Sequence, residues 1–335
     1  MGNTDKPEPQ SKSKNKTHLI QNFYLENDLF ADTDSDYTNG MRYSLAASQT
    51  KNVEDSKLPK FLKTANLKLL KAYEGFFPKK AKGVKIGTRF IATFAQRMYT
   101  PADKEPTKVI IDQRPYAGWL YFGMATHLRT NRQLNTLELD LGIIGPAALG
   151  REIQDAVHDV RGITKFQGWD NQLGNEVGFS IIFERKNKTQ KFHFGERLEA
   201  DIIGHWGGSL GNVATYLNTG VEFRLGWELP DDFGTSALRP GGDNAVSGST
   251  HEGFHLFASI DTRLVARDIF LDGNTFRKSH SVTKKNVVAD AALGFSFNFH
   301  RFKFSYARIF RTKEFDLQTK YHSYGSIAIS YWRKI

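Results

Sequence analysis

Cysteine is absent from the 335 residues of this chain. The chain therefore has no disulfide bonds, no thiolate ligands for a metal ion and no cysteine nucleophile. Long apolar runs are also missing: no stretch of 18 or more apolar residues occurs, which excludes a membrane-spanning helix. Because the strands of a transmembrane β-barrel are short and alternate between lipid-facing and interior residues, this second absence does not exclude a barrel.

Aromatic and basic residues are abundant by contrast. The chain has 26 Phe, 12 Tyr and 5 Trp, although its mean hydropathy of -0.47 is polar. This combination suits a barrel with an aromatic girdle and a wet interior, and a soluble β-sandwich is compatible with it too. The formal charge of +10 favours an anionic partner. No nucleic-acid-binding motif accompanies the charge, so we favour a phosphorylated lipid surface over nucleic acid.

Two segments stand apart from the rest of the chain. Residues 1–16 are polar and charged, which predicts a disordered lead-in to a single domain over 17–335. The lead-in lacks the apolar core of a signal peptide, so an exported form is expected to have lost its signal already. Residues 51–85 form a Lys-rich insertion with interspersed Leu and Phe. The insertion is either an amphipathic segment on a membrane surface or an ordinary solvated insertion.

Most of the chain shows the two-residue alternation of β-strands. The clearest case is the run Leu293, Phe295, Phe297 and Phe299, which a two-residue turn joins to Phe302, Phe304 and Tyr306. An even number of strands near twelve, each long enough to cross a tilted bilayer, predicts an all-β fold: one closed antiparallel transmembrane β-barrel. The predicted strands are 18–27, 38–48, 86–99, 116–128, 133–145, 174–187, 190–206, 213–229, 252–270, 281–299, 301–313 and 321–334.

In an up-and-down barrel the connections alternate between the two ends. Connections 27–38, 99–116 and 145–174 then share one end, and they contain the unusual residue patterns. The long links 49–85 and 230–251 fall at the opposite end, where such barrels usually have short turns.

The connection 145–174 contains the strongest helical pattern in the sequence, beginning at Gly145 and running through His158. Gly162 is a plausible end of this helix. Gln154 and His158 are four residues apart, so they share one helical face, which we expect to lie beside the buried apolar edge. The alternative is that His158 is an ordinary structural histidine. The residues predicted to form the buried apolar stripe are Leu149, Ile153, Ala156, Val157 and Val160.

The other two connections at this end offer oxygen and cationic groups. The first runs from Glu26-Asn27-Asp28 to Asp36-Tyr37-Thr38-Asn39-Gly40, and its carboxylate, amide and hydroxyl groups are the ligands that Ca²⁺ prefers. Its run Asp32, Asp34, Asp36 begins like an EF-hand loop but lacks the later glycine and glutamate, which favours a solvated loop. In the other connection, Lys104, Lys108 and Arg114 are candidates to meet phosphate groups, or are ordinary exposed cations.

The segment Gly207-Gly208-Ser209-Leu210-Gly211 matches the G-x-S-x-G nucleophile elbow. That motif requires a strand-turn-helix context, whereas Gly211 leads into another strand. We therefore reject a serine nucleophile at Ser209.

Several of these pieces together resemble the outer-membrane lipid A 3'-O-deacylase family (LpxR-type). The resemblance covers most of residues 20–240, whereas the C-terminal third matches only in its strand pattern. The matching pieces are Glu26-Asn27-Asp28, Asp36-Tyr37-Thr38-Asn39-Gly40, Tyr99-Thr100-Pro101, Arg114-Pro115-Tyr116-Ala117-Gly118-Trp119, Gly145-Pro146 through Gln154 to His158, Gly168-Trp169-Asp170-Asn171-Gln172-Leu173, Leu210-Gly211-Asn212 and Leu229-Pro230-Asp231-Asp232-Phe233-Gly234.

The resemblance implies a twelve-stranded outer-membrane barrel with its active site facing the outer leaflet, between the barrel wall and a helix in an extracellular loop. It implies Ca²⁺-dependent hydrolysis of the 3'-linked acyloxyacyl ester of lipid A. Asn27, Asp28 and Thr38 correspond to the metal-site positions, with Asn27 also counted among the catalytic residues. Gln154 and His158 correspond to the catalytic helix. Lys104 and Lys108 fall in the loop whose basic residues face the lipid phosphates.

One position departs from the family pattern. Relatives can carry an acidic residue between the histidine and the Gly-Trp turn, where this chain has Thr164, and Asp159 is a possible substitute. The expected mechanism is general-base catalysis, in which His158 takes a proton from water, Gln154 orients the ring or the water, and Ca²⁺ polarises the ester carbonyl. The implied partners are lipopolysaccharide and the outer membrane, with the protein acting as a monomer.

Two other functions are compatible with the same sequence. The first is a non-enzymatic outer-membrane barrel, a pore or an adhesion protein, that kept the fold and lost the chemistry. The second is a soluble barrel that binds anionic ligands.

Overall fold

The structure, a computed structural model, describes residues 18–27, 36–47, 87–235 and 252–334, and five single positions between 60 and 71. The predicted lead-in 1–16, Asp28, Asp32 and Asp34 lie outside the described residues, as does nearly all of the 51–85 insertion.

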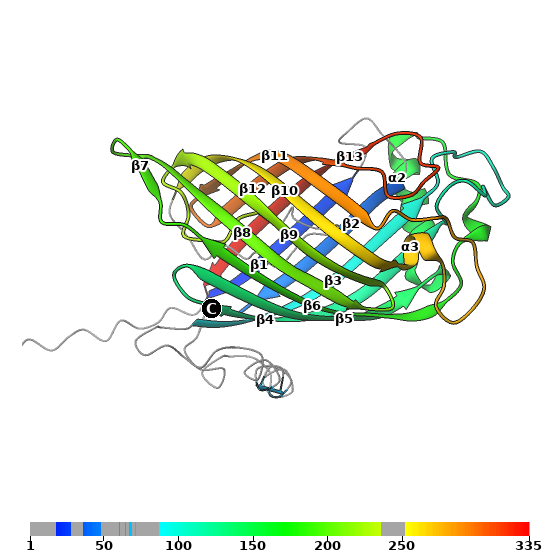
Figure 1. Cartoon of the computed structure of the whole chain (residues 1–335), viewed down its shortest axis with the longest axis horizontal. Helices are drawn as coiled ribbons and strands as arrows, with labels where there is room; N and C mark the ends of the chain where they lie inside the picture. Colours follow the sequence, from blue (N-terminus) through cyan, green and yellow to red (C-terminus); the bar gives the residue numbers. More distant parts are fainter. Residues whose placement is uncertain are drawn as a thin grey trace, which may run out of the picture.

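Twelve antiparallel strands close into one barrel, as predicted (Figure 1). Each strand pairs with its neighbours in the sequence, and the pairs β1–β13 and β6–β8 complete the circle. The twelve strands are β1 (His18–Asn27), β2 (Asp36–Ala46), β3 (Gly87–Thr100), β4 (Ala117–Arg129), β5 (Gln133–Ile144), β6 (Glu176–Lys188), β8 (Leu198–Gly211), β9 (Ala214–Trp227), β10 (Gly253–Asp268), β11 (Val287–Phe299), β12 (Phe302–Arg311) and β13 (His322–Lys334).

Two predicted strands are wrong in their extent: 281–299 begins only at Val287, and 190–206 is interrupted. A turn with Gly195 at φ 73° interrupts it. The part before the turn is the short strand β7 (Phe192–Phe194), which pairs only with β8 and projects beyond the barrel (Figure 1). The barrel strand β8 begins after the turn, at Leu198, and continues to Gly211. Alternation alone could not show this break, because both arms of a hairpin have the same two-residue period.

The two faces of the strands differ in chemistry. On β10, Leu256, Ile260 and Leu264 are more than half exposed on the outside, whereas Asp261 and Arg263 are buried on the inside. This alternation of apolar-out and polar-in is typical of a barrel that lies in lipid. None of the described helices is long and apolar enough to cross a membrane.

Ion pairs fill the interior of the barrel. The guanidinium of Arg224 pairs with Asp201 at 2.6 Å, and that of Arg42 pairs with Glu138 at 2.6 Å. All four side chains are almost completely inaccessible to solvent. Buried charges are tolerated only when they are paired in this way, so the lumen is a packed polar core.

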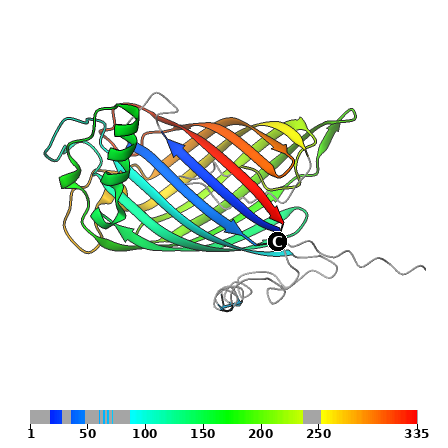
Figure 2. The same cartoon turned by 180° about the vertical axis from the view of Figure 1, so that it is seen from behind.

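The connections sort to the two ends as the alternation predicts. The helices α2 (Gly150–Arg161) and α3 (Ile269–Asp272) lie at one end, here called the α2 end (Figures 1 and 2). The 3₁₀ turns η3 (Pro146–Ala148) and η4 (Trp169–Asn171) flank α2 in the same connection. β1 begins and β13 ends at the opposite end, here called the far end.

The first residues of the long far-end link 230–251 fold into the barrel. After β9 the chain turns into the mouth of the barrel, where Leu229, Asp232 and Phe233 are buried. The carboxylate of Asp232 pairs with Lys303 at 2.7 Å and also with Arg224. This segment therefore occupies the far-end mouth.

Candidate active site

Four residues form a row across the outer face of the barrel at the α2 end. The strand register places Asn27 opposite Asn39, Asn39 opposite Met98, and Met98 opposite Gly118. Each of the four is four positions from an exposed aromatic residue on its own strand, and residues an even number apart share one face of a strand. All four therefore lie on the outer face. The exposed aromatic residues are Phe23, Tyr43, Phe94 and Phe122. Neighbouring strands are about 4.8 Å apart, so Asn27 and Met98 are separated by about 10 Å.

The helix α2 packs against this outer face, over β3 and β4. Glycines permit the close approach: a Cβ atom on Gly118 would lie 3.2 Å from the Cβ of Ala148 and 3.3 Å from the Cα of Gly150. Gln96 on β3 donates a hydrogen bond from Nε2 to the carbonyl oxygen of Ala148 at 2.6 Å. The start of the helix is thereby held against the barrel wall.

The buried edge of α2 is polar, and the prediction of a buried apolar stripe is wrong. Gln154 and His158 are only 2% and 1% exposed, whereas Leu149 and Val160 are 48% and 88% exposed. The inverted pattern has a physical reason: hydrogen-bond partners for the polar edge come from the segment that returns from α2 to β6. The predicted helix is confirmed from Gly150 to its end at Gly162 with φ 64°, whereas its first part, Pro146–Ala148, is a 3₁₀ turn.

The return segment fixes both polar side chains. The imidazole Nδ1 of His158 lies 2.8 Å from the carbonyl oxygen of Thr164. A carbonyl can only accept, so Nδ1 carries a hydrogen, and in the neutral imidazole Nε2 is the nitrogen with the lone pair. The indole Nε1 of Trp169 donates to Oε1 of Gln154 at 2.7 Å. No described residue bonds the amide Nε2 of Gln154, although this atom is buried.

An aromatic cluster surrounds these groups. Met98, Tyr116, Phe166 and Trp169 pack together, with Ile153 against them. The ring of Phe166 lies 5.8 Å from that of His158. Burial raises the pKa of Tyr116 to about 12, so its phenol stays neutral at physiological pH. The imidazole therefore lies beside apolar rings, where interactions with charged groups are stronger than in water.

The three candidate metal ligands belong to β1, β2 and the connection between them. Asn27 is the last residue of β1 and is 8% exposed. Thr38 lies where the β2–β3 register shifts, between Tyr37 and Asn39. Asp28 lies outside the described residues. The donors would be amide, carboxylate and hydroxyl oxygens, so their chemistry fits Ca²⁺. Within the described part of the chain, no three His, Cys, Asp or Glu residues form a metal site.

The three predicted phosphate-binding cations fall in two places. Lys104 lies with its Nζ 5.4 Å from the ring centre of Phe166, and its carbonyl accepts from the backbone of Gln167 at 2.8 Å. Lys108 is exposed on the same loop. Arg114 is buried and pairs with Glu314 at 2.9 Å, in the connection between β12 and β13. The structure brings Lys104 to the α2 connection, whereas Arg114 is paired with the connection between β12 and β13.

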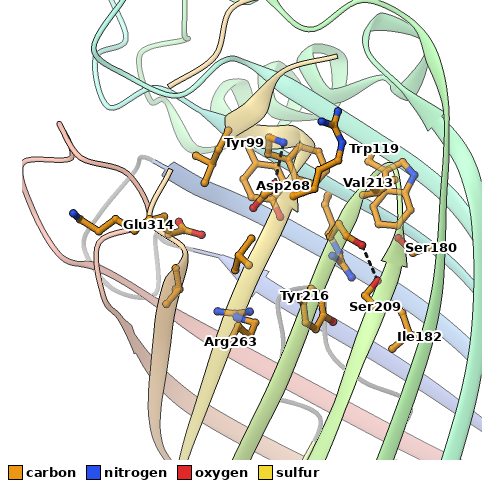
Figure 3. A pocket seen from close by; sticks show the side chains of 18 of the residues that line it. Tyr99, Trp119, Ser180, Ile182, Ser209, Val213, Tyr216, Arg263, Asp268 and Glu314 are labelled. Atoms are coloured by element: carbon orange, nitrogen blue, oxygen red, sulfur yellow. Dashed lines mark hydrogen bonds between the residues drawn. The ribbon is translucent and has the colours of Figure 1, made fainter. Parts of the chain in front are cut away.

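A separate cavity of about 70 Å³ lies inside the lumen near α3 (Figure 3). Tyr99, Trp119 and Asp268 line its upper part, and Arg263 lies deeper. Trp119 and Arg263 are buried side chains on the lumen side of β4 and β10. The cavity is therefore distinct from the outer-wall site at α2.

Ser209, which also lines this cavity, is on β8 and donates from Oγ to the carbonyl oxygen of Ala214 at 2.9 Å. The strand-to-strand context confirms that Gly207–Gly211 is not a nucleophile elbow.

Several site residues were not identified from the sequence. Gln96 and Gly118 matter because they meet α2 across the barrel wall, and Thr164 matters through its backbone carbonyl. Trp169 was part of a motif, but its bond to Gln154 was not predicted. Of these residues, Gly118 and Trp169 belong to stretches that carry the family resemblance, Arg-Pro-Tyr-Ala-Gly-Trp and Gly-Trp-Asp-Asn.

Together the fold and this site define a membrane β-barrel with a polar, histidine-containing site between its outer wall and a loop helix. The family described as outer membrane protein LpxR matches residues 4–333. The chain belongs to this family of outer membrane proteins.

One solved structure supports the fold of this family. LpxR from Salmonella typhimurium has 19% sequence identity and a TM-score of 0.72, covering 94% of this chain and 99% of its own. The β-domain of the Bordetella autotransporter BrkA has 8% identity and a TM-score of 0.41, covering 94% of this chain and 99% of its own. Among curated proteins no match is found.

Proposed function

We propose that this protein is a Ca²⁺-dependent lipid A deacylase that hydrolyses the 3'-linked acyloxyacyl ester. The observation that carries the proposal is the state of His158. Its Nδ1 lies 2.8 Å from the Thr164 carbonyl oxygen, so in the neutral ring Nε2 is the nitrogen that can take up a proton, in a buried site on the outer wall. Membership of the LpxR family supports the substrate class.

In the proposed reaction His158 is the general base. Its Nε2 takes a proton from a water molecule that attacks the ester carbonyl, a step typically worth about 10²–10⁴-fold in rate. The Thr164 carbonyl holds the ring in the required tautomer and favours the protonated imidazole that forms. This backbone group thereby fulfils the orienting role that an acidic side chain plays in many catalytic histidine sites.

Gln154 is proposed to orient the reacting groups. Trp169 holds its carbonyl oxygen, so the amide NH₂ is directed away from the indole and can donate to water or to a substrate oxygen. A fixed donor of this kind stabilises negative charge that develops on oxygen and needs no reorganisation during the reaction.

Asn27, Asp28 and Thr38 are the proposed Ca²⁺ ligands. When bound, the ion supplies a positive charge that polarises the ester carbonyl and stabilises its developing negative charge. Lys104 and Lys108 are proposed to face the lipid phosphates, where ammonium groups bind as point charges. Arg114 is not needed for this role, because Glu314 already pairs with it.

The proposed orientation places the α2 end outside the cell. Outer-membrane barrels have long extracellular loops and short periplasmic turns, and the helical connections lie at the α2 end. We propose that the protein acts there as a monomer on lipopolysaccharide of the outer leaflet.

Mass spectrometry of lipid A, before and after incubation with the purified protein and Ca²⁺, tests the proposal. We expect loss of the 3' acyl chains with the wild type and no loss with His158→Ala. His193→Ala is the matched control, because His193 is exposed on β7 at the far end. Unchanged lipid A after incubation with the folded wild type would contradict the proposed function and favour a non-enzymatic barrel.

A further inference from the structure

One flank of α2 is apolar and is only partly covered by described protein. Leu149, Ala156 and Val160 are exposed, and Ile153 and Val157 are half-buried. At about 100° per residue, these five positions fall within about 100° of one another around the helix axis. They lie next to the edge formed by Gln154 and His158, which faces the barrel wall.

The opposite flank of α2 is charged and faces the loops. Arg151 pairs with Asp170 at 2.8 Å, and Asp159 pairs with Lys165 at 2.7 Å. Both partners belong to the return segment, so this segment lies along the charged flank.

The return segment is in turn bonded to the loop between β3 and β4. The side-chain amide of Asn171 donates to the carbonyl oxygen of Thr107 at 2.8 Å. The backbone N–H of Gln167 donates to the carbonyl oxygen of Lys104 at 2.8 Å. That loop connects the ends of the two strands, so it lies beyond the wall at the α2 end. The charged flank therefore faces along the barrel axis, away from the strands and toward the loops. The apolar flank faces the other way, toward the strands of the outer wall.

The wall on that side carries the lipid-facing belt. Phe94, Phe122 and Leu141 are 57%, 46% and 57% exposed on the outer faces of β3, β4 and β5. Phe94 is four residues from Met98, the residue under α2, which is about 13 Å along the strand. The apolar flank of α2 therefore faces toward this belt, and Lys104 and Lys108 lie on the loop side of the helix.

We infer that α2 is embedded in the outer leaflet, with its apolar flank among the lipid acyl chains and its charged flank at the headgroups. The site at His158 then opens sideways into the leaflet, and an ester reaches it without leaving the membrane. Embedding follows from the outer-membrane location and the exposed side chains. The lateral entry of the ester rests in addition on the proposed function.

The absence of cysteine allows a sharp test of embedding. Val160→Cys and Asp159→Cys each introduce a single thiol, on neighbouring residues whose side chains belong to the two flanks. Each variant is spin-labelled in liposomes of phosphatidylcholine, phosphatidylglycerol and lipid A. Collisions of the label with oxygen, which concentrates in the bilayer, are compared with collisions with a water-soluble nickel chelate.

We expect the ratio of oxygen to nickel accessibility to be several-fold higher at position 160 than at position 159. Equal accessibility of both labels to the nickel chelate would overturn the inference. A label at 160 that neither reagent reaches would also overturn it, because a protein surface would then cover this flank.

A second measurement tests lateral entry. Val160→Asp places a charge on the apolar flank and leaves the buried edge of α2 unchanged. We expect deacylation of lipid A in liposomes to fall at least several-fold, and deacylation of lipid A dispersed in detergent to stay near the wild-type rate. Unchanged activity in liposomes would overturn lateral entry. If the wild type shows no deacylation in either system, the proposed function fails, and the spin-label result still decides whether α2 is embedded.

Discussion

Trp169 donates its indole N–H to the side-chain oxygen of Gln154 at 2.7 Å, and both side chains are almost completely buried. This bond determines which end of the Gln154 amide faces the indole. It also ties the middle of α2 to the segment that holds the imidazole of His158.

Trp169→Phe removes this bond and keeps most of the apolar volume. A hydrogen bond of this kind contributes about 0.5–1.5 kcal/mol, so we expect kcat to fall by up to about tenfold with little change in KM. Steady-state deacylation of lipid A in detergent measures this split. Trp206→Phe is the control, because Trp206 is exposed on the outer face of β8. An equal loss in both variants would show that Trp169 acts only through general stability.

Gly118 provides the second prediction, because it sets the distance between α2 and the wall. A Cβ atom there would lie 3.2–3.3 Å from Ala148 and Gly150, and a larger side chain must displace the helix. We expect Gly118→Val to abolish deacylation while the barrel stays folded, as judged by heat-modifiable gel mobility. Gly204→Val is the matched control, because no atom lies within 4 Å of a Cβ built at Gly204. Full activity of the Gly118 variant would show that the close approach is unnecessary.

Some features of this fold are predictable from the sequence. Alternation of apolar and polar residues is a local property, so the strands, the closed barrel and the common end of the three unusual connections followed from it. The break at Gly195 did not follow, because a turn between two similar arms leaves the alternation intact.

The orientation of α2 was predicted wrongly for a reason that applies to membrane proteins. The usual rule buries the apolar face of a helix, but the exterior of this barrel is itself apolar, and the polar edge with Gln154 and His158 turned inward. The Thr164 carbonyl could not be predicted, because every residue has one and only the fold selects which carbonyl meets the imidazole. The contact of Gly118 with Gly150 required knowledge of where the helix lies.

The ion pair between Arg114 and Glu314 gives a prediction about acid stability. Burial opposes ionisation of Glu314, but the nearby Arg114 and Arg311 outweigh it and lower the pKa of this carboxyl. A lowered pKa in the folded state stabilises the protein above the unfolded pKa of about 4.3, and this contribution is lost as the pH falls through the folded value.

We therefore expect Glu314→Gln to lower the free energy of unfolding at pH 7 by about 3 kcal/mol, because it removes the carboxylate that pairs with the buried guanidinium of Arg114. The difference from the wild type should shrink below about pH 4. Urea unfolding of the variant and the wild type in detergent, at pH 7 and pH 3, measures this difference in unfolding free energy. A difference that does not change with pH would show that the charge of Glu314 is not what stabilises the pair.

The far-end mouth gives a prediction that separates the enzyme from a pore. Asp232 is held by Lys303 and Arg224, and Phe233 beside it is buried. With the mouth filled and the lumen packed by ion pairs, we expect no steady channel conductance from the wild type in planar lipid bilayers. Asp232→Asn weakens the attachment of this segment and should produce flickering openings. Stable channels in the wild type would instead favour the pore.

Calcium dependence is the last prediction, and Asn27 is the described residue through which it is best tested. Asn27 is buried at the end of β1 and lies opposite Asn39 in the outer row. Loss of one neutral oxygen ligand weakens a Ca²⁺ site without removing it, because affinity depends on the number and charge of the ligands. We therefore expect Asn27→Ala to raise the Ca²⁺ concentration needed for half-maximal deacylation by about tenfold. Asp28→Ala, which removes a charge, should abolish activity at every accessible concentration. Asn135→Ala on β5 is the control and should leave the Ca²⁺ titration unchanged. Deacylation by the wild type in excess chelator would contradict the role of Ca²⁺ and leave His158 and Gln154 to act without a metal.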